Sequence, residues 1–237
     1  MLPSHGRRRA TILSLLMSCA VSAPAVAQDG ALDIGAQIRV RGEAIGGDFK
    51  PGRQDADERL GIQTLVTAEY ALGPVTLGGE LLDARDVGDD DLSATSAKNV
   101  NALEPLQAYV ALDLDNAAGA DTLRLLAGRY TLKIGSQRLV GRGSFGDVYT
   151  SYAGGYADWR SGDTRAIAFY GAPFVTLPGD ADGVRDADIE LDRTADATDF
   201  FGFSVTQGDI FAGLDAEAYI YRLAEGEDDA AHQRLVT

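Results

Sequence analysis

The sequence predicts an all-β fold: an antiparallel transmembrane β-barrel, to which this chain contributes about nine strands. Three observations lead to this prediction. Several stretches alternate strictly between apolar and polar residues, the connections between them alternate between long and short, and no persuasive helical period or apolar helix-length span follows residue 27. A membrane protein without such a helix has to cross the bilayer as a closed barrel.

The stretch LDIGAQIRVRGEA, residues 32–44, shows the alternation most clearly. Leu32, Ile34 and Ile38 fall on one side of an extended chain, and Arg39 and Arg41 fall on the other. In a soluble sandwich the apolar side would be the core, whereas in a membrane barrel it would face lipid and the charges would line a lumen. This strand alone leaves both possibilities open.

The lengths of the connections favour the barrel. The expected strands are 31–44, 58–72, 75–85, 103–114, 122–132, 154–160, 164–173, 198–207 and 210–223. Long connections (45–57, 86–102, 133–153, 174–197) alternate with shorter ones (73–74, 115–121, 161–163, 208–209). Outer-membrane barrels have tight periplasmic turns and long outer loops, while both ends of a sandwich meet water and need no such sorting.

The turns also predict registers in which the faces of adjacent strands match. A turn at 73–74 places Thr67 opposite Glu80, and a turn at 208–209 would place Thr206 opposite Phe211. A regular hairpin after the first strand sets Arg59 opposite Glu43. In this arrangement Leu60, Ile62, Val66 and Ala68 face lipid, and Gln63, Thr67 and Glu69 face water.

Residues 1–27 have the pattern of a secretory signal peptide. A basic segment, 7–9, precedes a short apolar run, and Ala25 and Ala27 occupy the small-residue positions of a cleavage site. Lipidation at Cys19 is an alternative that Met17 fits poorly. Cleavage after Ala27 would leave residues 28–237 with no cysteine and would shift the net charge from −15 to −18, which argues against a nucleic-acid partner.

The titratable residues do not form a catalytic or metal-binding pattern. The two histidines, His5 and His232, lie in the signal region and near the C-terminus. The acidic segments 88–91 and 179–192 miss the spacing of a calcium loop and are typical of solvated outer loops. We therefore expect no enzyme activity, no metal and no cofactor.

LRLLAGRYTLKIGSQRLVG, residues 123–141, resembles the alginate export family of outer-membrane porins. The matching positions are Gly128, Arg129, Gly135, Ser136, Arg138 and Leu139; ELLDAR (80–85), LQAYVAL (106–112) and APFVTLPGD (172–180) are similar to other family stretches. The resemblance implies a large barrel in the outer membrane of a Gram-negative cell, carrying polysaccharide or small anionic solutes. It also implies contact with outer-membrane lipid, with lipopolysaccharide and with the barrel assembly machinery. Residues 142–159 lack the family's R-x-F-D-G-like stretch, so alginate itself does not follow as the substrate.

Family arginines help to line an anionic path, and the candidates here are Arg39, Arg41, Arg59, Arg129 and Arg138. For each, the alternative is a cross-strand ion pair or a contact at the rim. Arg39 and Arg41 stand two apart with no acid between them on their strand, so we expect a local anion-selective step there, in a lumen of otherwise mixed charge. A soluble periplasmic or surface all-β binding module is the alternative function.

Nine strands that start at the periplasm would end outside the cell, whereas single-chain bacterial barrels have an even number of strands. We therefore expect residues 28–237 to be the N-terminal half of a barrel of roughly 16–18 strands, cut short at the C-terminus.

Overall fold

The computed structural model describes residues 17–27, 30–46, 56–87, 95–137, 139–142, 146–211 and 213–226. Its strands are β1 (Met17–Ala27), β2 (Gly30–Gly46), β3 (Ala56–Leu72), β4 (Val75–Val87), β5 (Asn101–Asp115), β6 (Thr122–Tyr130), β7 (Tyr152–Ser161), β8 (Thr164–Val175), β9 (Arg193–Thr194), β10 (Thr198–Phe211) and β11 (Leu214–Glu225). One short helix, α1 (Ala181–Asp186), lies between β8 and β9. The all-β prediction is confirmed, and the nine expected strands correspond to β2–β8, β10 and β11.

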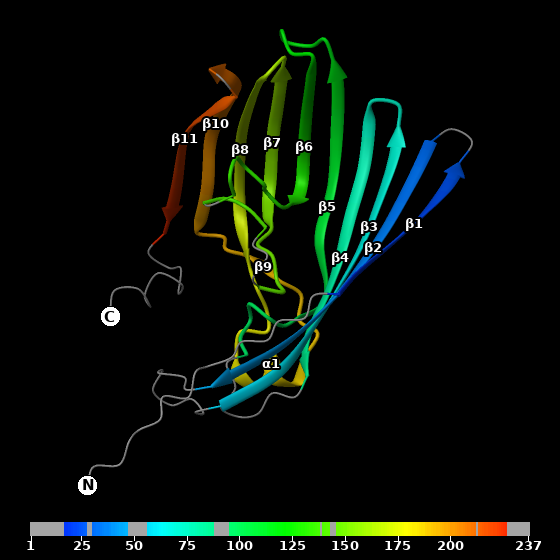
Figure 1. The fold of residues 1–237 in the computed structure, drawn as a ribbon, viewed down its shortest axis with the longest axis vertical. Coiled ribbons are helices and arrows are strands. Elements are labelled where there is room, and N and C mark those ends of the chain that lie inside the picture. The colour runs from blue at the N-terminus through cyan, green and yellow to red at the C-terminus, as the bar shows by residue number, and fades with distance from the viewer. Residues whose placement is uncertain are drawn as a thin grey trace.

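The strands form a single antiparallel sheet in the order β1-β2-β3-β4-β5-β6-β7-β8-β10-β11, with the short β9 paired to β8. Figure 1 shows the short turns, such as those after β3 and β7, at the upper end and the long connections at the lower end. The sheet is open, and β1 and β11 form its two edges. This is the architecture of a partial barrel. Among the described residues, no helix is long and apolar enough to cross a membrane.

The predicted registers are confirmed for the first two hairpins and wrong for the last. Thr67 pairs with Glu80, and Glu43 pairs with Arg59. The predicted turn at 208–209 is instead an irregularity inside β10, which continues to Phe211. Thr206 therefore pairs with Glu217 rather than with Phe211. Asp209 adopts a positive φ of 48° at this irregularity, so the Gly-Asp pair bends a strand rather than ending it.

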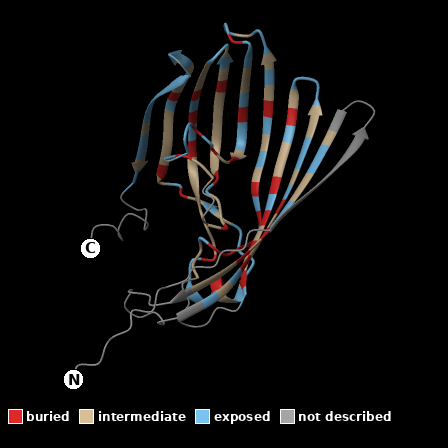
Figure 2. Ribbon diagram, in the orientation of Figure 1, coloured by how far each residue is buried: buried red, intermediate tan, exposed pale blue. Residues whose placement is uncertain are grey.

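The two faces of the sheet differ in chemistry. We call the face covered by the β6–β7 connection (131–151) the inner face, and the opposite one the outer face. Large apolar side chains remain exposed on the outer face, including Val66 (39%), Leu77 (45%) and Val110 (50%). Figure 2 shows the resulting alternation of exposed and buried residues along the strands. An exposed apolar outer face suits contact with lipid rather than with water.

The buried core lies between the inner face and the connection 131–151. Ile134 and Val140 from the connection pack in one cluster with Ile167 and Phe169 of β8. Val148 and Tyr149 pack against a second cluster, made of Leu65, Leu82, Ala84 and Leu106. The long connection therefore does not simply extend beyond the rim; its apolar residues fold it back into the interior.

β1 includes the end of the predicted signal peptide. Residues 17–27 pair along their whole length with β2, Met17 with Val40 and Ala27 with Gly30. Cleavage after Ala27 would remove β1 and leave β2 as an edge that needs a new partner. Removal of the signal stays a prediction, and residues 1–16 lie outside the described residues.

Candidate functional site

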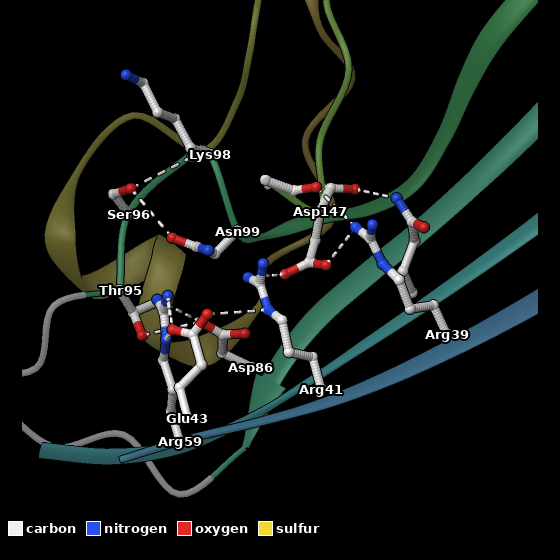
Figure 3. A network of polar contacts seen from close by, with 12 residues as sticks. Arg39, Arg41, Glu43, Arg59, Asp86, Thr95, Ser96, Lys98, Asn99 and Asp147 are labelled. Atoms are coloured by element: carbon white, nitrogen blue, oxygen red, sulfur yellow. Dashed lines mark hydrogen bonds and ion pairs between the residues drawn. The ribbon is translucent and has the colours of Figure 1, made fainter. Parts of the chain in front are cut away.

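A buried network of charged side chains occupies the inner face of β2, β3 and β4 near the long connections (Figure 3). The carboxylate of Asp147, in the β6–β7 connection, accepts hydrogen bonds from Nη2 of Arg39 at 2.6 Å and from Nη2 of Arg41 at 2.7 Å. Arg39 Nη2 also donates to the carbonyl oxygen of Gly146 at 2.6 Å. Both arginines and Asp147 are at most 7% exposed. The two guanidinium groups thus converge on one carboxylate.

The network continues along β2 and β3. Arg59 Nε donates to Glu43 at 2.7 Å, and Arg41 Nε lies 3.1 Å from the other oxygen of Glu43. Arg59 Nη1 lies 3.4 Å from Asp86 of β4, whose carboxylate also accepts a 2.9 Å hydrogen bond from the Thr95 hydroxyl. Three arginines therefore face three carboxylates, and the formal charges cancel. Such pairing offsets the cost of burying each charge.

Asp147 is held in place through its backbone as well as its side chain. Its carbonyl oxygen accepts a hydrogen bond from Gln63 Nε2 at 2.5 Å, and its N–H donates to the carbonyl oxygen of Lys98 at 3.1 Å. The Arg142 guanidinium lies 4.3 Å from the Tyr149 ring centroid and binds both oxygens of Glu80 at 2.9 Å. The segment that carries Asp147 is therefore a fixed part of the inner wall.

Arg129 anchors a different connection. Its guanidinium pairs with Glu104 of β5 and, at 3.0 Å, with Asp192 of the β8–β9 connection. Its Nε donates to Ser151 Oγ at 2.8 Å, and its Cζ lies 3.7 Å from the Phe174 ring centroid. Burial raises the pKa of the Asp192 carboxyl, and the neighbouring Glu104 acts in the same direction. One arginine thus joins the connection 176–197 to the wall of the sheet.

The remaining motif residues shape the chain around these contacts. Gly128 has a φ of +131°, and a Cβ there would clash with the carbonyl oxygen of Ala108, so the position requires glycine. Gly135 has a φ of +51° and lies against the carboxylate of Glu217 in β11. Ser136 and Leu139 line a hollow of about 450 Å³ between the connection and β11. Arg138 lies outside the described residues.

Further ion pairs of the inner face have arginines that are more exposed. Arg124 lies 3.3 Å from Asp113, and Arg165 lies 2.7 Å from Asp158. Arg124 and Arg165 keep 32% and 39% of their side chains exposed. The inner face thus has mixed charge along the strands, with its most buried pairs beneath the connections.

The comparison with known protein families agrees with this architecture. The profile of the alginate export family matches residues 31–234. The chain belongs to the alginate export family. The match covers nearly all of the open sheet, from β2 to beyond β11. Searches of curated proteins and of solved structures each find no significant match. The alginate export family consists of outer-membrane porins, which agrees with the apolar outer face and the sorted connections.

The five candidate arginines fall into three groups. Arg39, Arg41 and Arg59 share one network, Arg129 lies in another, and Arg138 is not described. The role of each as a substrate contact stays a prediction. Sequence reasoning missed Asp147, which lies 106 residues beyond Arg41 in a segment without alternation. The one available signal was an acid between aromatic and apolar residues, Phe145 and Val148, in a long connection.

Proposed function

We propose that this protein is an outer-membrane channel for the export or diffusion of polysaccharide or other anionic solutes. The observation that carries the proposal is the inner-face network, in which two nearly buried guanidinium groups meet at a carboxylate supplied by a connection. Carboxylates of a passing solute offer the same hydrogen-bond acceptors as Asp147. The apolar outer face and the family support the location in the membrane.

In this function, Arg39 and Arg41 form an anion-selective step whose strength is set by Asp147. Asp147 and the neighbouring carboxylates balance the charges of the arginines, so the guanidinium groups offer hydrogen bonds to anions without a net potential that would trap them. A site that holds its cargo too tightly would not conduct, since conduction requires binding that is weak enough to release. Arg59 belongs to the same network, but it is shared between Glu43 and Asp86 and serves mainly to hold β2, β3 and β4 in register.

The test is a planar-bilayer measurement on the protein purified from outer membranes. Under a salt gradient, the double variant Arg39→Ala/Arg41→Ala should move the reversal potential toward cation preference. Arg85→Ala is the matched control, because Arg85 pairs with Asp83 and has a side chain that is 42% exposed on the outer face. An unchanged reversal potential in the double variant would mean that these arginines serve the fold alone.

We also propose that residues 1–27 direct the chain to the secretory route and are removed from the mature protein. The barrel assembly machinery would then insert residues 28 onward into the outer membrane. N-terminal sequencing of the protein extracted from outer membranes should begin at Gln28. Recovery of Met1, or of an acylated Cys19, would contradict this proposal.

A further inference from the structure

The outer face carries an apolar groove across β7, β8, β10 and β11. Its volume is about 590 Å³, within the range of roughly 300–1,000 Å³ that small-molecule sites usually span. Register pairs align its lining in two cross-strand rows. Gly155, Tyr170, Phe201 and Arg222 form the first row, and Ala168, Phe203 and Ile220 form the second. Gly155 has no side chain and Ala168 has only a methyl group, so the surface is hollowed at these two positions, and aromatic rings lie around the hollow.

Arg222 differs from the arginines of the inner face. It is exposed, and it forms no ion pair with any residue in the described part of the chain. Its contact is with the Phe201 ring, whose centroid lies 5.8 Å from Cζ. The nearby Asp199 already accepts a 2.6 Å hydrogen bond from the Tyr170 hydroxyl. Arg222 therefore presents a positive charge at one end of an apolar groove.

The position of the groove along the strands matters for its occupant. Phe201 is close to the start of β10 and Arg222 close to the end of β11, so their row lies toward the long connections. In outer-membrane barrels the long connections are on the external side. The aromatic rings of the groove fit the belt where the hydrocarbon of the outer leaflet meets its headgroups. An arginine there reaches toward the headgroups and needs an anion beside it.

We propose that this groove binds a phosphate-bearing lipid, with an acyl chain along the apolar rows and the phosphate at the Arg222 guanidinium. The acyl chain buries Phe203, which is 45% exposed, and Ile220, which is 72% exposed. The planar guanidinium can donate two parallel hydrogen bonds to phosphate oxygens, which distinguishes a phosphate from a neutral headgroup. The site depends on the membrane location of the barrel and not on which solute passes through it.

The experiment titrates lipid into the full-length protein, purified from outer membranes in detergent, and counts bound lipids by native mass spectrometry. The probes are phosphatidylglycerol, which carries an anionic phosphate, and diacylglycerol with the same acyl chains, which carries no phosphate. One basic residue at an anionic lipid surface contributes enough to predict at least about a five-fold preference for phosphatidylglycerol. All variants are first checked for the heat-modifiable gel migration of a folded barrel.

Three substitutions separate the parts of the site. Arg222→Gln should abolish the preference between the two lipids while leaving diacylglycerol binding unchanged. Ala168→Phe fills the groove and should weaken the binding of both lipids. Arg85→Gln, which removes an outer-face arginine outside the groove, should change neither. Millimolar inorganic phosphate should not displace phosphatidylglycerol.

Three results would overturn the assignment: no preference in the wild type, a preference that survives Arg222→Gln, or displacement by inorganic phosphate. The last would indicate a bare anion site rather than a lipid groove. Failure of these tests would leave the solute selectivity of the lumen untouched, because that selectivity is measured with the inner-face variants Arg39→Ala/Arg41→Ala.

Discussion

Replacing Asp147 by asparagine tests the inner-face network most directly. The change keeps the shape of the side chain and the backbone contacts to Gln63 and Lys98, but it removes one negative charge from a network of three arginines and three carboxylates. Arg39 and Arg41 then lose the carboxylate that lies 2.6–2.7 Å from their Nη2 atoms. Removing one partner of a buried ion pair typically costs about 3–5 kcal/mol. We expect the free energy of unfolding to fall by about that amount.

The same substitution should make the pore more selective for anions. At about 8 Å, through water, one unit charge changes the energy of a passing ion by roughly 0.5 kcal/mol. The effect has opposite signs for anions and cations, so the ratio of their permeabilities should shift by about five-fold, since 1.4 kcal/mol corresponds to a factor of ten. The assay is the reversal potential of the protein from outer membranes in a planar bilayer under a salt gradient.

Asp83→Asn is the matched control for this prediction. Asp83 pairs with Arg85 on the outer face, where its side chain is 29% exposed, so its charge does not act on the lumen. The reasoning is refuted if Asp147→Asn leaves the reversal potential where it was while the barrel stays folded. A shift toward cation preference would be equally damaging, because it would mean that the freed arginines do not face the permeating ions.

Three further outcomes follow from the faces, the backbone and the titratable groups. In cysteine scanning with a water-soluble thiol reagent, Glu69→Cys should be labelled and Val66→Cys should not. Gln63→Cys should be labelled poorly, because Asp147 covers this position. Equal labelling at positions 66 and 69 would refute the assignment of faces. Gly128→Ala should lower the free energy of unfolding, measured in urea, by about 1–3 kcal/mol, because the φ of +131° and the Ala108 carbonyl oxygen exclude a Cβ at this position. An unchanged free energy of unfolding would contradict this explanation. Burial raises the pKa of the Asp192 carboxyl in the folded protein, so the folded state binds a proton there more readily than the unfolded chain does. The attachment of the connection 176–197 should therefore become stronger as the pH falls through the folded pKa, and hydrogen exchange at the Leu177 amide measures it. Asp192→Asn should remove this pH dependence.

The sequence alone determined the strands β2–β8, β10 and β11 and which of their faces is apolar, but it predicted neither β1 nor β9 nor α1. Alternation with a period of two is a local property, and short turns such as 73–74 fix the register of adjacent strands. The pairing of Arg59 with Glu43 was therefore within reach, because only one hairpin separates them. The turn expected at 208–209 failed because Gly-Asp is compatible both with a tight turn and with a bend inside a strand.

Only the tertiary structure decided how the connection 131–151 folds and what it brings to the inner face. Its path depends on apolar residues such as Ile134 and Val148 finding partners on strands far apart in the sequence, a choice that no local period encodes. That path delivers Asp147 to Arg39 and Arg41 and turns an apparently unbalanced pair of arginines into a neutral network. Likewise, the sequence places Arg222 only on the outward side of a strand. The pairing of four strands in the sheet aligns it in one row with Phe201, Tyr170 and Gly155. Electrostatic and apolar contacts between distant segments act through space, so the sequence supplied their members but not their pairing.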